Sequence, residues 1–183
     1  MTRSTLLRFK PVTWAPLCLC VAIMGNSHAA LAAGGGSADI KLKDGTVAGH
    51  VEILPAPSGA FLRVKLTGLT PGGPAVTVHE TGKCEGDLAS AGAILNPLGA
   101  GQGLLNDEGP AAGDLPNVFA SATGEAEAEF ISPLLQPGSG EGDPLFDDDG
   151  SAIVIYDKPD DHLGASEGVP GERIACGVIA KAP

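Results

Sequence analysis

Turn-forming residues interrupt this sequence at short intervals, and they constrain its fold more than any other feature. The 183-residue chain contains 27 glycines and 15 prolines, about 23% of all residues, without the three-residue period of collagen. Between these residues lie short apolar runs. In several of them apolar and polar residues alternate, as in a sheet with one solvated face. We therefore expect an all-β protein rather than a helical one.

The same pattern predicts about eight strands, and an antiparallel sandwich or Greek-key barrel is the natural arrangement for them. The strands are expected at residues 40–43, 47–54, 60–66, 75–80, 116–122, 125–131, 152–156 and 173–180. Long loops are expected at residues 81–115, 133–150 and 157–171. The first of these has no lasting period, and a loop of that length is usually functional or anchored by something other than secondary structure.

The first 32 residues have the layout of a secretory signal peptide. A basic start, with Arg3, Arg8 and Lys10, precedes an apolar run at residues 14–24 and two small-residue motifs that end at Ala29 and Ala32. A membrane anchor is the weaker interpretation, because a spanning helix needs about 20 apolar residues. We expect an exported protein, periplasmic or extracellular, without a membrane span after cleavage.

Behind this segment, residues 33–37 are expected to be a flexible lead-in and residues 38–183 to form the folded domain. Cleavage after Ala32 leaves 151 residues with 8 basic and 22 acidic side chains, a net charge of −14. This charge argues against nucleic acid or anionic lipid as a partner. Only two cysteines remain, Cys84 and Cys176. In an exported protein they are most simply one disulfide, worth about 4 kcal/mol in the chain-entropy model.

Six segments together carry a resemblance to a known family. They are GERIACGVI (171–179), LTGLTPG (66–72), VHE followed by GKC (78–84), SAG (90–92), NPL (96–98) and GDLPN (113–117). In this order and spacing they resemble the copper/zinc superoxide dismutases, across about residues 38–180. The resemblance implies an eight-stranded Greek-key β-barrel, or sandwich, with two long loops. It also implies a disulfide that ties the first loop to the last strand, at the positions of Cys84 and Cys176.

The resemblance implies that most of the family's metal ligands are missing here. Members hold copper with four imidazoles and zinc with three imidazoles and one carboxylate, with one histidine shared. The copper positions fall on Thr77, His79, Ile94 and Tyr156, with Ile94 at the shared position; the other zinc positions fall on Gln102, Ala111 and Asp114. Only one ligand of each metal remains, His79 and Asp114.

The substituted positions offer poor ligands or none. Ile94 and Ala111 have no donor atom, and a threonine hydroxyl or a glutamine amide is a weak ligand for copper or zinc. His79 and Tyr156 could share a metal, but two ligands would hold it weakly. We expect no cofactor; the alternative is copper, zinc or both. His79 is expected to be a buried imidazole bonded to a carbonyl, and Asp114 a carboxylate that accepts backbone N–H groups.

Further charged residues have plainer explanations. Arg173 matches the arginine that guides superoxide in the family, and without copper we expect it to bond to loop carbonyls near the disulfide. Asp160 falls near the aspartate that braces ligand histidines in relatives, and we expect it to be solvated. His50 and His162 are isolated, so each is expected to be exposed or bonded to a partner. The acidic run Asp147-Asp148-Asp149-Gly150, with Glu141 and Asp143 upstream, resembles a calcium loop in composition only.

Three functional hypotheses follow. The first is a non-catalytic, exported member of the superoxide dismutase family with a binding or structural role. The second is a dismutase with a rearranged copper site, and the third is a metal carrier or sensor. The sequence names no partner, and a homodimer is one possible assembly. Because metal bonds would not anchor residues 85–113, we also predict lower order there than in the strands.

Overall fold

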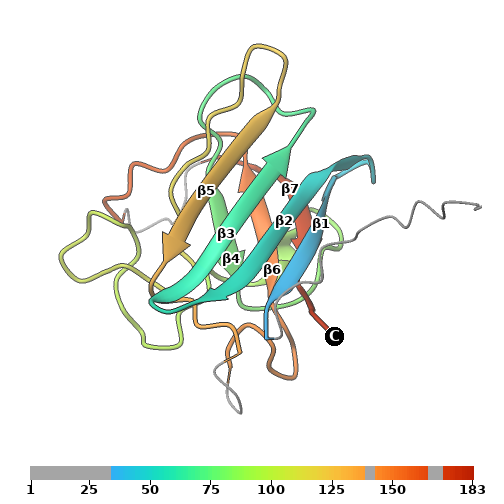
Figure 1. The fold of residues 1–183 in the computed structure, drawn as a ribbon. Helices are drawn as coiled ribbons and strands as arrows, with labels where there is room; N and C mark the ends of the chain where they lie inside the picture. The colour runs from blue at the N-terminus through green and yellow to red at the C-terminus, as the bar shows by residue number, and fades with distance from the viewer. Residues whose placement is uncertain (1–33, 139–142, 165–170) are drawn as a thin grey trace, which may run out of the picture.

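The computed structural model describes residues 34–138, 143–164 and 171–183, so the predicted signal segment lies outside the described residues. The described residues form eight strands and one 3-10 turn, η1 (Ala89–Ala91) (Figure 1). The strands are β1 (Gly36–Leu42), β2 (Val47–Ala56), β3 (Gly59–Leu66), β4 (Val76–His79), β5 (Ala126–Ser132), β6 (Ala152–Tyr156), β7 (Arg173–Val178) and β8 (Ala180–Lys181). Within these ranges no helix has the length and hydropathy that crossing a membrane requires.

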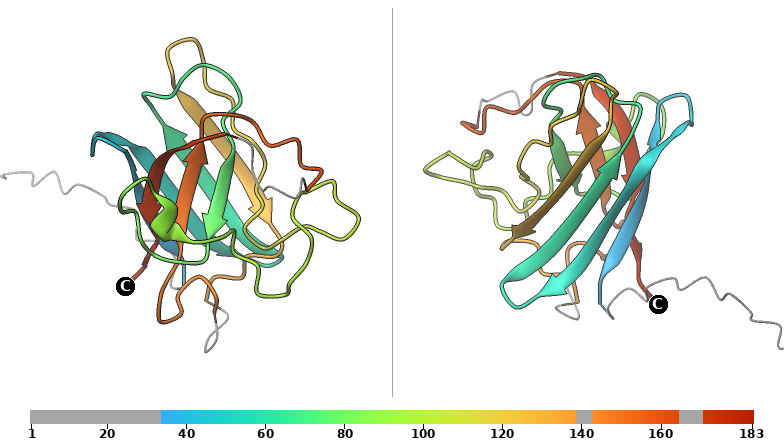
Figure 2. Two further views of the ribbon diagram at one scale, coloured as in Figure 1. Left: turned by 180° about the vertical axis from the view of Figure 1, so that it is seen from behind. Right: turned by 45° about the horizontal axis from the view of Figure 1, so that its top comes forward.

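The strands pair antiparallel in one curled sheet of order β4-β6-β7-β1-β2-β3-β5, and β8 pairs with β1. After the β1–β3 meander the chain crosses to β4 at the opposite end of this order, then returns to β5 beside β3. Long crossing connections of this kind are typical of Greek-key folds. Figure 2 shows β4, β6 and β7 facing the layer of β1–β3 and β5. The predicted all-β fold is confirmed.

Alternation of side chains along the strands places the core between these two layers. In β3, Ala60, Leu62, Val64 and Leu66 point inward and are at most 2% exposed, while the residues between them face outward. Every residue of β6 is buried, because the loop after β4 also covers its outer face. There Leu88 and Ala91 pack with side chains of β6 in a second apolar cluster.

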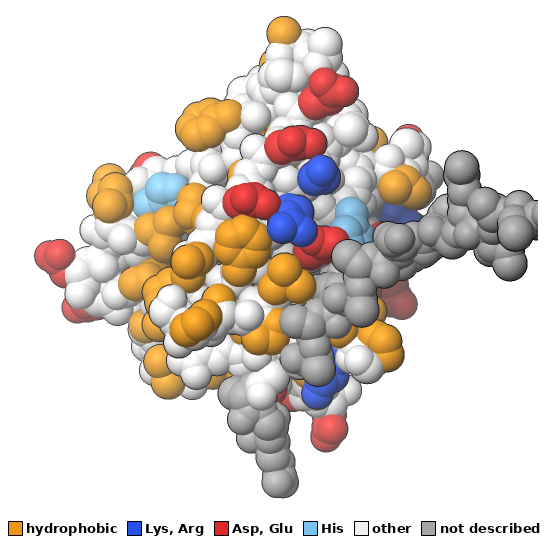
Figure 3. Space-filling model, in the orientation of Figure 1, with side chains coloured by type: hydrophobic (Ala, Val, Ile, Leu, Met, Phe, Trp, Pro, Cys, Tyr) orange, Lys and Arg blue, Asp and Glu red, His pale blue; other side chains and the backbone are white. Residues whose placement is uncertain are grey.

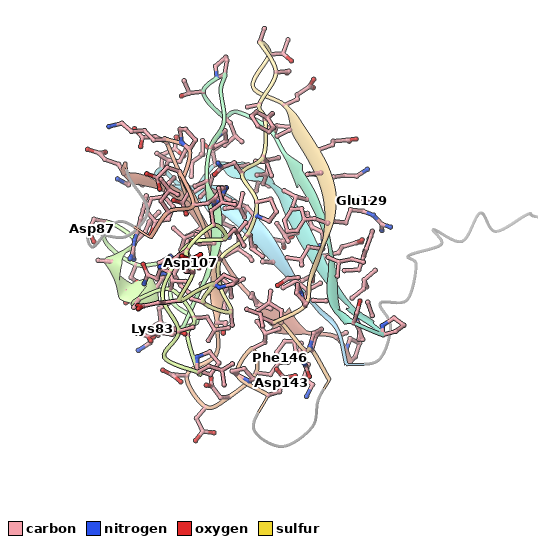
Figure 4. All side chains as sticks on the ribbon, turned by 90° about the vertical axis from the view of Figure 1, so that its left-hand side faces the viewer. Lys83, Asp87, Asp107, Glu129, Asp143 and Phe146 are labelled. Atoms are coloured by element: carbon pink, nitrogen blue, oxygen red, sulfur yellow. A yellow bond between two sulfur atoms is a disulfide. The ribbon has the colours of Figure 1, made fainter. Side chains whose placement is uncertain are left out.

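The outer face of the β2–β3–β5 layer is charged. Arg63 donates to Glu52 at 2.6 Å and to Glu129 at 2.8 Å, in register across the three strands. Figure 3 shows basic and acidic side chains gathered on this face. Figure 4 shows Glu129 on this side, whereas Asp87 and Asp107 lie on the loops at the opposite side of the sheet. The long loop region therefore lies away from the charged sheet face.

Two details of the sequence prediction are wrong. Residues 116–122 do not form a strand: Ala120 makes one isolated bridge with Gly72, and the Val118 N–H donates to the Pro74 carbonyl. Pro116 lacks an N–H donor, which weakens a strand at this point. The predicted lead-in also ends early, since β1 begins at Gly36. A Cβ there would lie 2.9 Å from the Phe146 ring, so glycine lets the strand approach that ring.

The predicted disulfide between Cys84 and Cys176 is confirmed. Their Cα atoms are 5.7 Å apart, and 92 positions separate them in the sequence. The bond ties the loop after β4 to β7, which is the connection that the family resemblance implies. It therefore fixes the loop that carries Leu88, Ala91 and Gly92 over the outer face of β6.

Candidate metal centre

Three of the four copper positions lie together behind the disulfide-tied loop. Thr77 and His79 lie on β4, Tyr156 ends the neighbouring β6, and each is at most 6% exposed. The fourth, Ile94, lies on the loop and makes an isolated bridge with His79. The fold thus brings these four positions to one place, as the resemblance implies, although only one of them carries an imidazole.

Both ring nitrogens of His79 are occupied by hydrogen bonds. Nδ1 lies 3.0 Å from the Gly92 carbonyl oxygen, which can only accept, so Nδ1 carries the proton and donates. Nε2 is then the acceptor, and it lies 3.0 Å from the Thr77 hydroxyl and 3.2 Å from the Tyr156 hydroxyl. The lone pair that would bind a metal is directed at two hydroxyl groups.

Burial keeps this cluster neutral. Desolvation lowers the pKa of His79 to about 4, and the nearby Arg173 charge adds to the effect, while the bond to Gly92 opposes it. Desolvation also raises the pKa of Tyr156, against the lowering effect of Arg173. At neutral pH the pair is therefore a neutral imidazole beside a neutral phenol. A phenolate ligand would have to form against the effect of burial.

Arg173 anchors the loop that covers this cluster. Its guanidinium donates to the Leu88 carbonyl at 2.7 Å and to the Gly92 carbonyl at 2.8 Å. Gly92 therefore accepts hydrogen bonds from both Arg173 and His79. The arginine at the family's guiding position is used here to hold backbone carbonyls.

On the zinc side, the carboxylate position is kept and the histidine positions are not. Asp114 is 4% exposed, and its Oδ2 accepts the N–H groups of Gly103 at 2.6 Å and Ala111 at 2.9 Å. Ala111 and Ile94 are buried and apolar, and Gln102 is half-buried. Desolvation raises the pKa of Asp114, opposed by its two backbone hydrogen bonds.

The residues at the copper positions do not fit copper. Three of the four carry no imidazole, and the remaining His79 already directs Nε2 at Thr77 and Tyr156. In the described part of the chain, no three His, Cys, Asp or Glu side chains converge in a geometry that would hold a metal ion. The family's two-metal centre is therefore not present as a set of ligands in these residues.

Two residues near Asp114 differ from the sequence expectation. Asp160, expected to be solvated, has a side chain only 12% exposed, and the His162 side chain is 17% exposed. His162 is not isolated, because its Nδ1 lies 3.5 Å from Asp160 Oδ2. The reason is Asn117, which bonds to both the N–H and the carbonyl of Asp160 and draws that loop inward. This asparagine belongs to the GDLPN motif, but its partner could not be predicted from the sequence.

The other candidates make only local hydrogen bonds. His50 bonds to Asp39 at 2.8 Å on the outer sheet face, and both side chains are exposed. In the acidic run, Asp147 accepts the Gly150 N–H in a local turn. Asp143 is buried and accepts the N–H groups of Gly138 and Leu145. Glu141 lies outside the described residues.

A curled antiparallel sheet with a disulfide-tied loop over a mostly substituted two-metal centre defines a narrow class of protein. The family model for copper/zinc superoxide dismutase matches residues 47–179. A Cu-Zn superoxide dismutase of Caulobacter vibrioides is 46% identical over 146 residues, covering 78% of this chain and 84% of the relative. The superoxide dismutase-like protein YojM of Bacillus subtilis is 33% identical over 140 residues, covering 75% of this chain and 71% of that protein.

Solved structures agree with the sequence comparisons. A SOD-like protein from Bacillus subtilis matches with a TM-score of 0.71 at 31% identity, covering 79% of this chain and 97% of that one. The Cu/Zn superoxide dismutase from Brucella abortus matches with a TM-score of 0.65 at 25% identity, covering 80% and 99% of the two chains. This chain belongs to the copper/zinc superoxide dismutase family.

Proposed function

We propose that this protein is an exported member of the family that does not dismutate superoxide and has a binding or structural role. The observation that carries the proposal is the closed cluster of Thr77, His79 and Tyr156. Dismutation needs a metal that cycles between two oxidation states, and several imidazoles serve both states of copper. Here the one imidazole among the copper positions directs its free lone pair at two hydroxyl groups.

Charge supports the same proposal. With a net charge of −14 after signal removal, the mature chain repels the superoxide anion unless a local positive field offsets it. Arg173, the residue that would supply that field, is part-buried and donates to two backbone carbonyls. The remaining scaffold is an ordered sheet with a covalently tied loop, which suits a binding or structural role.

Export is supported by two independent features. Residues 1–32 have the basic, apolar and small-residue segments of a cleavable signal, and the folded part carries a disulfide, which persists in oxidising compartments. The expected mature protein begins at Ala30 or Ala33. Mass spectrometry of the protein recovered from the periplasm or medium checks this, and an uncleaved chain in the cytoplasm would contradict it.

A dismutase with a rearranged copper site is the second candidate, favoured by the 46% identity to a relative named as a Cu-Zn superoxide dismutase. One experiment distinguishes this candidate from the non-catalytic protein proposed above. Purified mature protein is incubated with copper and zinc, dialysed, and assayed for bound metal and dismutase activity. We expect no stoichiometric copper and no activity above free metal. Stoichiometric copper with activity would establish the second candidate.

A reconstruction serves as the positive control. Replacing Thr77, Ile94 and Tyr156 with histidine returns all four copper imidazoles to positions that the fold already brings together. We expect this variant to bind one copper per chain where the wild-type protein binds none. Tyr156→Phe is the matched negative control, because it removes the phenol hydroxyl without adding an imidazole.

A further inference from the structure

The outer face of the β2–β3–β5 layer carries three cross-strand rows of side chains. Strand register pairs the members of each row, and alternation along the strands points all three rows away from the core. The first row is His50, Lys65 and Glu127; the middle row is Glu52, Arg63 and Glu129; the apolar row is Leu54, Phe61 and Ile131. Figure 3 shows charged side chains on one half of this face and apolar ones on the other. The face therefore changes from charged to apolar along the strands.

The apolar row forms a continuous patch on an otherwise solvated face. Leu54 and Phe61 are half-buried, and Ile131 is 55% exposed. Single apolar side chains are common on protein surfaces, but these three lie in register on adjacent strands. The guanidinium carbon of Arg63 lies 5.8 Å from the centre of the Phe61 ring. A partner that covers the patch therefore meets the charged middle row at its border.

The charged rows contain more carboxylates than basic groups can neutralise. In the middle row Arg63 is shared between Glu52 and Glu129, which leaves a formal charge of −1. In the first row the Lys65 ammonium lies 3.7 Å from the Glu127 carboxylate, and both side chains are exposed, so this ion pair is weak. Positive charge on a partner is therefore favoured at both rows.

A groove of about 740 Å³ opens beside the first row, a volume within the range of ligand pockets. Its lining includes two buried apolar side chains and three exposed carboxylates: Leu66, Ala126, Asp39, Glu125 and Glu127. No side chain fills the groove from β2 at Gly49, where a Cβ would clash with the Lys65 carbonyl oxygen. Because three carboxylates line the groove against one lysine, the groove favours a cation with an apolar stem.

The strands set the distance between the groove and the apolar row. Four residues separate the first row from the apolar row, as from Lys65 to Phe61, and this spans about 13 Å of strand. An extended peptide covers the same distance in four residues, and its side chains at positions i, i+2 and i+4 point to one side. A basic side chain at i would reach the groove, a polar or basic one at i+2 the middle row, and an apolar one at i+4 the apolar row.

We propose that the outer face of β2, β3 and β5 binds an extended basic segment of a partner protein, with a Lys or Arg side chain in the groove and an apolar side chain four positions away on the apolar row. The proposal rests on the proposed function, because it assigns the binding role to a surface. Across the rows and the groove, five carboxylates face two permanent cations, Arg63 and Lys65. This charge selects a basic partner over a second copy, which would bring the same negative face.

The test titrates the mature protein, with its disulfide intact, into a capped peptide that carries an uncharged dye. The peptide Gly-Lys-Thr-Lys-Thr-Phe-Gly has its first lysine and its phenylalanine four positions apart, and fluorescence anisotropy reports binding. We expect saturable one-to-one binding that weakens as salt is added. The peptide Gly-Lys-Thr-Lys-Phe-Thr-Gly has the same composition but points its phenylalanine to the other side. It should bind at least about threefold more weakly, because the apolar contact is lost.

Two variants of exposed residues test the two ends of the surface. The double variant Glu125→Gln, Glu127→Gln removes two carboxylates from the groove and should weaken binding of the first peptide about fivefold. Ile131→Ser removes the most exposed member of the apolar row and should weaken it about threefold. Because all three side chains are exposed, these changes leave the core intact.

Matched controls make the same chemical changes elsewhere. The double variant Asp87→Asn, Asp107→Asn removes the same charge from loops at the opposite side of the sheet (Figure 4). Leu105→Ser removes an apolar side chain that is also exposed, on the loop that contains Asp107. Peptide affinity in both controls should stay within about twofold of the wild-type value, because distant exposed charges are screened.

Three results would overturn the proposal: no saturable binding, equal affinity for the two peptides, or equal losses in the two charge variants. A dimer in sedimentation velocity that Ile131→Ser dissociates would also overturn it, in favour of a second copy on this face. The test is separable from the proposed function. Copper-dependent dismutation would refute the proposed function and leave the peptide titration unaffected, whereas failure to bind the peptide refutes only this surface.

Discussion

On the copper side of the centre, Thr77, His79 and Tyr156 bond to one another, whereas on the zinc side Asp114 and His162 each keep a buried polar atom without a partner. The copper-side substitutions supply hydroxyl groups to the remaining imidazole. The zinc-side substitutions are mostly apolar, and only the backbone N–H of Ala111, not its side chain, donates to the remaining carboxylate. Loss of ligands can therefore satisfy the remaining polar group in one half of a site and leave the polar groups of the other half unsatisfied.

The largest expected effect is on stability, from removing the disulfide that holds the copper-side loop. The double variant Cys84→Ser, Cys176→Ser should lower the free energy of unfolding by about 4 kcal/mol, because the bond closes a loop of 92 positions. Chemical denaturation measures this. Hydrogen exchange should accelerate more at residues 81–95, which depend on the disulfide, than at 101–115, which Asn117 and Leu105 also hold. Equal acceleration would contradict the distinction between the two halves.

The next largest effect is the difference in unfolding free energy lost when each of two histidines, His79 and His162, is replaced. His79→Ala should cost about 3 kcal/mol of unfolding free energy, because it leaves a buried cavity and removes partners from Thr77, Tyr156 and Gly92. His162→Ala, measured without metal, should cost less than about 1 kcal/mol, since it removes a nitrogen that has no partner. Urea denaturation of the two variants measures both losses. Equal losses of unfolding free energy would contradict the expected difference between the two halves of the site.

The pH dependence should have opposite signs in the two halves. His79 is neutral when folded, with a pKa of about 4 against 6.5 in the unfolded chain. Acid therefore favours the unfolded state between about pH 6.5 and pH 4, by at most about 3 kcal/mol. The raised pKa of Asp114 acts oppositely, because its folded form takes up a proton more readily as the pH falls. His79→Gln should flatten the loss on acidification, and Asp114→Asn should steepen it.

Arg173 offers the smallest of the losses expected on the copper side. Arg173→Met keeps most of the apolar stem but removes two donors to the Leu88 and Gly92 carbonyls, which should cost about 2 kcal/mol. Thermal unfolding measures the loss. If the arginine served mainly to guide an anion, its removal would leave stability unchanged.

Much of the fold could be predicted from local signals. Alternating runs bounded by glycine and proline located β2 and β3 closely, and two cysteines in the domain sufficed for the disulfide. The strand predicted at residues 116–122 does not form. Strand propensity is a local property, whereas the conformation of this segment depends on Asn117 bonding to Asp160 in a distant loop. The prediction for β1 failed by a few residues because Gly36 lies against Phe146, which no window of the sequence reveals.

The candidate site was also predictable only in part. The resemblance implied the positions that surround His79, because their order and spacing along the chain match those of the family. It did not indicate that His162 and Asp160 would lie close enough to Asp114 to influence its charge, because that approach depends on loop tethers rather than on spacing. The prediction that residues 85–113 are less ordered than the strands stays a prediction, for which hydrogen exchange is the measurement.

The most direct test of the closed copper half is copper binding by the purified mature protein, compared with the variant that carries histidine in place of Thr77, Ile94 and Tyr156. The lone pair of His79 is engaged in the wild-type protein, so we predict no stoichiometric copper and no dismutase activity there, with one copper per chain in the variant. One tightly bound copper and dismutase activity in the wild-type protein would contradict the account.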